Sequence, residues 1–318
     1  MSNTGVHGRL CRSDNVRYDS VINDTKVAIV TGGSSGFGRL MSITLARNGY
    51  RVFAAFRGSK GGFEGQAKLL EARAAAASAD LETVEMDVTD DGSVNGVVRD
   101  VIGRAGRIDV LVNNAGVGML GPIENTTVEQ AQALFDVNVF GVLRTVRAVV
   151  PVMRKQRSGT IINVGSDQGV HANLFHTMYA PSKAAVESLS QVLRWELQQF
   201  GIRVVVLAPG WYKTEFGESL VKTFEGPAGQ AYARLAEALT QGRAAVESGN
   251  DEPQQVADRV LEILQRSDAP FRVTSGWNPV RMAGVNPTEI DEYERRLFEH
   301  YQLGEFAGPW VKGPEATK

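Results

Sequence analysis

A phenol and an ammonium group lie four residues apart, at Tyr179 and Lys183. This separation places two side chains on one face of a helix. A lysine some 5 Å away would supply roughly 3 of the roughly 4 kcal/mol that bring the pKa of a phenol from about 10 toward about 7. The pair could therefore be a proton donor and the group that tunes it.

Ser166 follows a predicted strand over residues 160–164 and precedes Tyr179 by thirteen residues. Sheets of the α/β class bind ligands at the carboxyl ends of their strands, so this hydroxyl could hold a substrate oxygen. Taken alone, a serine in this place is more often a turn cap. Asn138 interrupts a largely apolar helical stretch, residues 134–140, and a buried asparagine needs hydrogen-bond partners.

A glycine-rich turn separates the first predicted strand from the first predicted helix. Its glycines would let the backbone turn tightly and approach a pyrophosphate at the helix N-terminus. The spacing is G-x-x-x-G-x-G rather than the G-x-G-x-x-G dinucleotide pattern, and a simple strand-to-helix turn is an equal alternative. The candidate cofactor-binding residues of this turn are Gly32, Ser34, Ser35, Gly36, Phe37 and Gly38.

The choice between the two nicotinamide dinucleotides is expected at the end of the second predicted strand. An acidic residue there would bind the ribose of NAD, and a basic one the 2′-phosphate of NADP. The strand ends in Phe56 and Arg57, and Ser34 and Lys60 could assist the arginine. Charge-assisted bonds to a phosphate contribute roughly 1.5–3 kcal/mol, which predicts about a ten- to hundredfold preference for NADP(H). The alternative is a solvated surface arginine.

The elements that must position these side chains alternate between short β-branched runs and longer helical patterns. This alternation predicts an α/β fold, a doubly wound parallel sheet of the Rossmann type formed as a single domain. The predicted strands are residues 26–31, 51–56, 83–88, 110–113, 160–164, 203–208 and 271–274, and the main predicted helices after the first are residues 64–77, 94–102, 128–154 and 182–200.

Three further segments surround or interrupt this predicted domain, residues 25–276. Residues 1–24 show neither period and are predicted to be a flexible extension. Residues 211–252 change pattern between the last two strands and predict a lid over the substrate site, the alternative being an ordinary surface hairpin. Residues 277–318 form a C-terminal extension, in which 287–301 resemble an amphipathic helix that could cover the substrate mouth or a partner subunit.

Composition excludes several functions. A formal net charge of −2 provides no positive field to attract nucleic acid or an anionic membrane. No apolar run approaches the roughly 18 residues of a membrane span, and the N-terminus lacks the apolar core of a signal peptide. One cysteine, Cys11, fits a reducing compartment, so we expect a cytoplasmic protein. The sequence shows no cluster of metal ligands.

Taken in order, these features resemble the short-chain dehydrogenase/reductase family over about residues 26–276. The motifs at the family's spacing are the glycine turn, Asp87-Val88, Asn113-Asn114-Ala115-Gly116, the set Asn138, Ser166, Tyr179 and Lys183, and Pro209-Gly210 followed by Thr214. Residues 53–57 and 118–124 look like the branch that contains 17β-hydroxysteroid and retinol dehydrogenases.

The resemblance implies hydride transfer between NADP(H) and a carbonyl or alcohol. Tyr179 would protonate the substrate oxygen, Ser166 would hold it, and Asn138 would anchor a water linking Lys183 to solvent. Tyr179 and Lys183 would also contact the cofactor. The other implied cofactor contacts are Asp87 and Val88 at the adenine, Asn114, Ala115 and Gly116 at the ribose, and Pro209, Gly210, Tyr212 and Thr214 at the nicotinamide. Tyr212 replaces a commonly aliphatic residue.

The segments around residues 171–178 and 211–216 are rich in apolar and aromatic groups, which indicates a small, apolar carbonyl or alcohol substrate. The family usually forms homodimers or homotetramers through the helices that flank the Ser166 strand. Two other functions remain open on sequence alone. One is a catalytically idle NADP(H)-binding sensor or scaffold; the other is a nucleotide-sugar epimerase or dehydratase, which also uses a tyrosine and a lysine at this spacing.

Overall fold

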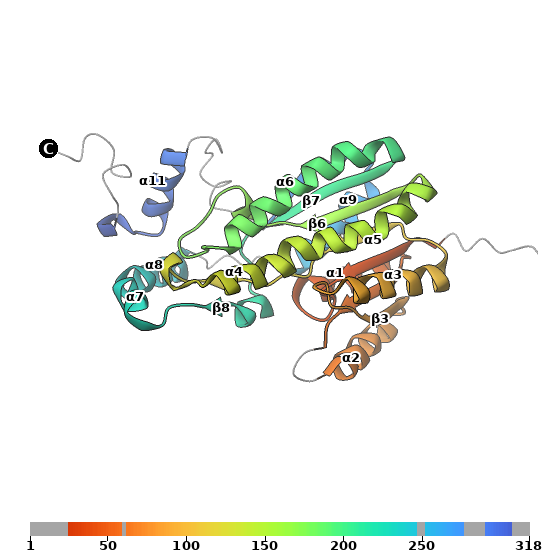
Figure 1. The fold of residues 1–318 in the computed structure, drawn as a ribbon, viewed down its shortest axis with the longest axis horizontal. Helices are drawn as coiled ribbons and strands as arrows, with labels where there is room; N and C mark the ends of the chain where they lie inside the picture. Colours follow the sequence, from red (N-terminus) through yellow and green to blue (C-terminus); the bar gives the residue numbers. More distant parts are fainter. Residues whose placement is uncertain (1–24, 59–61, 247–251, 277–289, 307–318) are drawn as a thin grey trace, which may run out of the picture.

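A computed structural model describes residues 25–58, 62–246, 252–276 and 290–306 of this chain. Its centre is a sheet of seven parallel strands in the order β3-β2-β1-β4-β6-β7-β9 (Figure 1). This confirms the predicted single-domain, doubly wound sheet of the Rossmann type. The strands are β1 (Val27–Thr31), β2 (Arg51–Phe56), β3 (Leu81–Glu85), β4 (Val110–Asn113), β6 (Gly159–Val164), β7 (Ile202–Pro209) and β9 (Arg272–Ser275).

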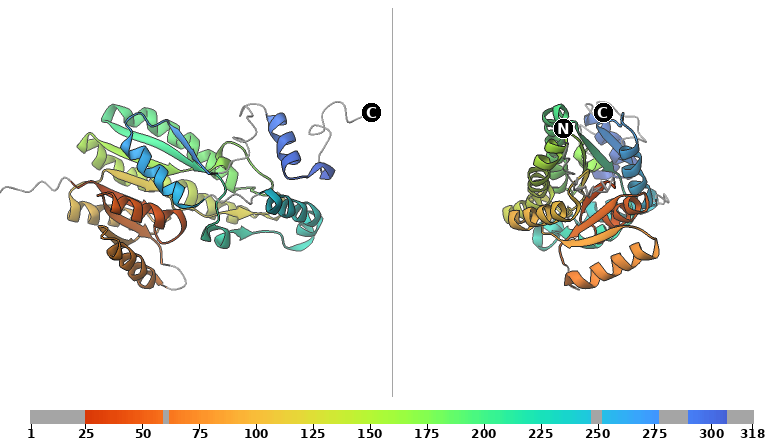
Figure 2. Two further views of the ribbon diagram at one scale, coloured as in Figure 1. Left: turned by 180° about the vertical axis from the view of Figure 1, so that it is seen from behind. Right: turned by 90° about the vertical axis from the view of Figure 1, so that its right-hand side faces the viewer.

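Helices cover both faces of the sheet (Figure 2). One core lies under α1 (Gly36–Arg47), α2 (Gly62–Ala76) and α9 (Gln254–Gln265). The other lies under α3 (Asp91–Ala105), α5 (Gly141–Gln156) and α6 (Tyr179–Leu197). Alternate residues of β1 supply the two cores, as expected of a strand buried on both faces.

The strand order reverses at β1, which pairs with β2 on one side and with β4 on the other. The connections leave in opposite directions at this point and open a crevice beyond the carboxyl ends of the strands. The glycine turn after β1, the loop after β4 and Ser166 after β6 all lie at this edge. The topology therefore gathers the motifs that the sequence separates.

The helix predicted over residues 128–154 is instead three segments. A helix, α4 (Val128–Phe135), leads into a π-helical turn, η2 (Asp136–Phe140), before α5 begins. The predicted helical stretch is therefore present, but it contains a π-helical turn that the sequence pattern did not indicate. At this turn the Asn138 side chain is hydrogen-bonded to Val117 and Ser182, and such insertions often mark functional sites.

Two other boundaries differ from the prediction. The helix expected from residue 182 already begins at Tyr179, because Pro181 falls in its first turn, where a proline needs no backbone N–H. The third strand ends at Glu85, so Asp87 and Val88 lie in the loop beyond it.

The segment between β7 and β9 extends beyond the strand ends (Figure 1). It contains η5 (Glu215–Ser219), α7 (Gly226–Ala231), α8 (Ala233–Val246) and a short strand, β8 (Val221–Lys222), which pairs with β5 (Met119–Leu120). Residues of α8 pack against α11 (Ile290–His300) and the residues after it through Leu239, Leu297, Tyr301 and Leu303.

Besides η5, the described residues contain the short 3-10 helices η1 (Ile123–Asn125), η3 (Asp167–Gly169), η4 (Gln198–Phe200) and η6 (Gly304–Phe306). The predicted extension over residues 1–24 lies outside the described residues, as does Lys60. Among the helices that are described, none combines the length and the apolar character needed to cross a bilayer.

Candidate active site

The glycine turn is shaped to receive an anion. Gly32 and Gly36 have φ of +66° and +47°, which favour glycine, and a Cβ on Gly38 would collide with the Gly32 carbonyl oxygen. Helix α1 starts at Gly36, its N-cap residue Ser35 makes no side-chain capping bond, and its first turn holds no acidic side chain. The N–H groups at this helix start and the helix dipole thus suit the diphosphate of a dinucleotide.

The loop after β4 is fastened to the end of β1. Asn114 donates from Nδ2 to the Thr31 carbonyl at 2.9 Å, and the backbone N–H groups of Asn114 and Ala115 both donate to Thr31 Oγ1 at 3.0 Å. These bonds hold Asn114, Ala115 and Gly116 in the wall of the cavity that begins at the glycine turn.

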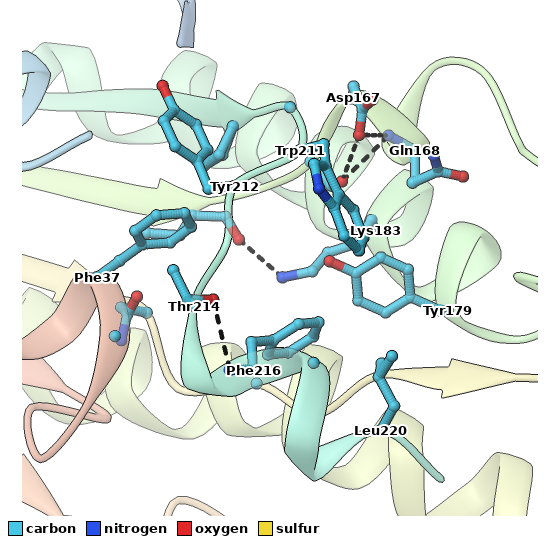
Figure 3. A pocket seen from close by; sticks show the side chains of 18 of the residues that line it. Phe37, Asp167, Gln168, Tyr179, Lys183, Trp211, Tyr212, Thr214, Phe216 and Leu220 are labelled. Carbon is cyan, nitrogen blue, oxygen red and sulfur yellow. Dashed lines mark hydrogen bonds between the residues drawn. The ribbon is translucent and has the colours of Figure 1, made fainter. Parts of the chain in front are cut away.

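Ser166, Tyr179 and Lys183 converge in that same cavity (Figure 3). Ser166 comes from the end of β6, whereas Tyr179 and Lys183 come from the first two turns of α6. The Lys183 Nζ lies 5.7 Å from the centre of the Tyr179 ring and donates to the Val164 carbonyl at 2.9 Å.

Burial governs the protonation of this pair. It raises the pKa of the Tyr179 phenol well above its usual value, against a lowering by the Ser166 hydrogen bond and with a further rise from the Asp167 charge. It lowers the pKa of Lys183 to about 8, although Glu187 acts in the opposite direction. Lys183 is not among the causes of the raised pKa of Tyr179, so the tuning role predicted for this lysine stays a prediction for the protein with its cofactor bound.

An acidic residue that the sequence analysis overlooked lies beside Ser166. The Ser166 hydroxyl donates to Asp167 Oδ1 at 2.9 Å, and the Gln168 N–H donates to the same oxygen at 2.8 Å and to Ser166 Oγ at 3.2 Å (Figure 3). Asp167 and Gln168 both line the cavity. The signal available in the sequence was a carboxylate directly after the candidate serine.

Asn138 lies outside the cavity lining and is 1% exposed. Its Oδ1 accepts from the Val117 N–H at 2.8 Å, and its Nδ2 donates to the Val117 carbonyl at 2.9 Å and to Ser182 Oγ at 3.0 Å. The amide therefore fastens the β4 loop to α6. The predicted role of Asn138 as the anchor of a water stays a prediction.

The candidate adenosine contacts lie outside the cavity that holds Tyr179. Arg57 is 67% exposed at its side chain, and its Nη1 lies 3.5 Å from Asp87 Oδ2. Burial raises the pKa of Asp87, but hydrogen bonds from Thr89 and the Arg57 charge outweigh it and hold the pKa below its usual value. Val88 is buried, and its side chain packs so closely on Gly141 that a Cβ there would press against it. Arg57 is thus paired with the neighbouring candidate residue.

The loop after β7 brings Pro209, Gly210 and Thr214 to the cavity. Tyr212 also reaches the lining, but its ring points toward Phe37 and away from Tyr179 (Figure 3). Its hydroxyl lies 2.7 Å from Ser275 Oγ, and the residue is 7% exposed. The side chain of Tyr212 is therefore part of the core, and only its backbone can face a ligand.

The cavity has a volume of about 540 Å³, within the range of small-molecule sites. Trp211, Phe216 and Leu220 give it an apolar wall, and the Phe216 ring centre lies 5.9 Å from that of Tyr179. Its polar lining beyond Ser166 includes Asp167, Gln168, Asn173 and His176, and Tyr301 closes it from the C-terminal segment. Among the residues that the structure describes, no group of three acidic, His or Cys side chains could hold a metal.

Known proteins resemble this chain in sequence and in structure. The family model described as short chain dehydrogenase matches residues 26–224. Retinol dehydrogenase 8 of Bos taurus is 34% identical over 259 residues, which are 78% of this chain and 80% of the relative. Estradiol 17-beta-dehydrogenase 1 of Rattus norvegicus is 32% identical over 315 residues, 92% of this chain and 88% of the relative.

Solved structures extend this similarity to nicotinamide complexes. A short-chain dehydrogenase from Streptomyces avermitilis has a TM-score of 0.72 and 32% identity, over 90% of this chain and all of the other. A short chain dehydrogenase/reductase from Burkholderia phymatum in complex with NAD has a TM-score of 0.70 and 26% identity, over 88% and 95%. Actinorhodin polyketide ketoreductase with NADPH has a TM-score of 0.66 and 26% identity, over 79% and 95%.

Proposed function

The chain belongs to the short-chain dehydrogenase/reductase family, and we propose that it transfers a hydride between NADP(H) and a small, largely apolar carbonyl or secondary alcohol. Membership makes it an oxidoreductase of the alcohol/carbonyl type with a nicotinamide cofactor. The observation that carries the proposal is the meeting of Ser166, Tyr179 and Lys183 in one cavity with the glycine turn at the start of α1.

Each catalytic group has a distinct task in this proposal. When bound, the nicotinamide supplies or accepts the hydride. Tyr179 donates a proton to the substrate oxygen in reduction and removes it in oxidation; its raised pKa keeps it protonated, as an acid requires. Ser166 holds that oxygen beside the phenol. Lys183, whose ammonium lies against the Tyr179 ring, stabilises the phenolate when it forms.

The residues present fit a dinucleotide. The diphosphate would lie against the glycine turn and the N-terminus of α1. Asn114, Ala115 and Gly116 would flank the ribose near Tyr179 and Lys183, and the backbone of residues 209–214 would meet the nicotinamide. The side chains of Asp87 and Val88 would bound the adenine.

NADP(H) is the proposed dinucleotide because the second strand ends without a carboxylate. Phe56 is buried and apolar, and Arg57 follows it with an exposed guanidinium. Such a group can form charge-assisted bonds to a 2′-phosphate. Both an NAD complex and an NADPH complex occur among the structural neighbours, so the choice depends on Arg57.

The proposed substrate is apolar because Trp211, Phe216 and Leu220 form one wall of the cavity. Trp211 and Phe216 remain 44% and 36% exposed, which leaves apolar surface to contact a ligand. The names of the two relatives, which refer to retinol and estradiol, agree with such a substrate. Residues 211–252 would serve as the lid of this site.

Two further proposals concern the setting of the enzyme. A homodimer or homotetramer is proposed through α5 and α6, where Leu143, Val192 and Trp195 are exposed apolar side chains. A cytoplasmic location is proposed from the single cysteine of the sequence.

The direct test is loss of NADPH absorbance with a panel of ketones, aldehydes, steroids, retinoids and sugar nucleotides. Turnover of apolar carbonyls is the expected result. Tight NADPH binding without turnover of any compound would favour the idle sensor, and turnover confined to sugar nucleotides would favour the epimerase-type alternative.

A further inference from the structure

The carboxylate of Glu215 lies on the start of α1, where the proposed function places the diphosphate. Its Oε2 accepts a hydrogen bond from the Gly36 N–H at 3.2 Å. Its Oε1 accepts from Arg39 Nη2 at 2.9 Å. Glu215 is 179 residues from Gly36 in sequence, so the tertiary fold brings a carboxylate to this helix start.

This carboxylate takes the role of the missing cap. Ser35 makes no side-chain capping bond, so the helix dipole and the first N–H groups of α1 are left to another anion. A hydrogen bond from its own backbone N–H, together with Arg39 and Gly36, holds the pKa of Glu215 below its usual value. The carboxylate is therefore ionised at neutral pH and competes with other anions for this place.

Glu215 also begins the segment that covers the catalytic tyrosine. Thr214 caps the short helix η5 by accepting from the Phe216 N–H. Phe216 lies against Tyr179, and it packs with Leu220 over Gly118. The bonds from Glu215 to α1 thus fix where this part of the lid starts.

We propose that Glu215 is a placeholder for the cofactor diphosphate and that its displacement couples dinucleotide binding to the position of the lid. A single N–H group cannot serve a carboxylate and a phosphate at once, and the two negative charges repel each other. Arg39, held at the same helix start, supplies the counter-charge to whichever anion is present. The inference rests on the proposed function, because it requires the diphosphate to bind at α1.

The test compares nucleotide binding by the wild type and by Glu215→Gln, which keeps the size of the side chain and removes its charge. NADPH should bind the variant about tenfold more tightly, as judged by nucleotide fluorescence at low salt. ADP-ribose, which contains the diphosphate, should show the same gain in competition. Adenosine 2′-monophosphate, which lacks it, should bind both proteins equally. Glu225→Gln is the matched control, because it removes the same charge from residues 211–252 at a position ten residues after Glu215.

Equal or weaker NADPH binding by Glu215→Gln would overturn the proposal. So would a gain shared by adenosine 2′-monophosphate or by Glu225→Gln, because it would reflect net charge rather than competition at α1. Hydrogen exchange without nucleotide gives a second readout: residues 214–220 should exchange faster in Glu215→Gln, and wild-type rates would contradict the coupling to the lid. A wild-type protein that binds neither NADPH nor NADH would instead defeat the proposed function.

Discussion

The Asp167 carboxylate sets the electrostatic environment of Ser166 and Tyr179. It accepts a hydrogen bond from the Ser166 hydroxyl and lines the same cavity as the Tyr179 phenol. Its negative charge opposes formation of a tyrosinate and contributes to the raised pKa of Tyr179. Asp167 therefore favours the protonated phenol that reduction needs and disfavours the phenolate that oxidation needs.

Asp167→Asn tests this effect. Oxidation needs the ionised phenol, so its kcat/KM falls as the pH drops through the pKa of Tyr179. Removing the charge should lower that pKa and move the acid limb of the profile down by about one pH unit. Asp167→Glu, which retains the charge, should leave the limb in place. An unchanged limb in Asp167→Asn would show that the carboxylate does not act on Tyr179.

Arg57 is the residue on which we propose that the choice of dinucleotide depends. Arg57→Asp removes the partner of the 2′-phosphate and offers a carboxylate to a ribose. We expect the ratio of kcat/KM for NADPH over NADH to fall about ten- to hundredfold. Arg147→Asp, at an arginine of α5 with a similarly exposed side chain, is the control. A ratio that does not change in Arg57→Asp would mean that another residue selects the cofactor.

The location of a single residue could be predicted from the sequence where that residue lies close to the end of a strand or helix. Ser166 and Tyr179 could be placed at one sheet edge because both follow β6 closely. The orientation of Tyr212 could not be predicted, since it depends on a hydrogen bond to Ser275, 63 residues away. The contact of Glu215 with Gly36 was hidden for the same reason.

At the scale of elements, the π-helical turn η2 holds the β4 loop against α6. Asn138→Ala removes three hydrogen bonds and leaves partly buried backbone groups of Val117 without these partners. We expect a loss of about 2–4 kcal/mol in the free energy of unfolding, measured with denaturant. Asn95→Ala, on the surface of α3, should cost less than about 0.5 kcal/mol. Equal losses would remove the structural role given to Asn138.

The sheet strands were predictable to within a few residues because continuous β-branched runs identify buried parallel strands. The break in the helix over residues 128–154 was not, because helical periodicity continues through it with a shift of one residue. The hydrogen bonds of Asn138 in η2 go to Val117, which is 21 residues away in the sequence, so the helical pattern alone does not indicate this turn.

At the scale of the whole molecule, the C-terminal segment packs against α8 and reaches the cavity. Leu297 is 5% exposed in the cluster with Leu239 and Tyr301, and Tyr301 reaches the cavity. The sequence alone left open whether this helix covers the substrate mouth or a partner subunit. The structure brings Tyr301, which directly follows this helix, to the cavity lining, and this contact depends on packing between segments about 60 residues apart.

Leu297→Ala should therefore affect the substrate more than the cofactor. Deleting buried methyl groups weakens this cluster by about 2–5 kcal/mol, which should loosen the lid and raise KM for the carbonyl. The NADPH dissociation constant should stay near that of the wild type, because the glycine turn lies outside this cluster. Leu69→Ala, at an exposed residue of α2, is the control. If the NADPH dissociation constant rose as much as KM for the carbonyl, the cluster would not act on the substrate alone and the prediction would be contradicted.

The measurement that tests the central claim most directly is turnover by Tyr179→Phe beside its binding of NADPH. Loss of the phenol proton should lower kcat at least about a hundredfold while the NADPH dissociation constant stays within a factor of about three. Tyr232→Phe, at a tyrosine outside the cavity lining, should retain wild-type turnover. Wild-type turnover by Tyr179→Phe would contradict the assignment of Tyr179 as the proton donor.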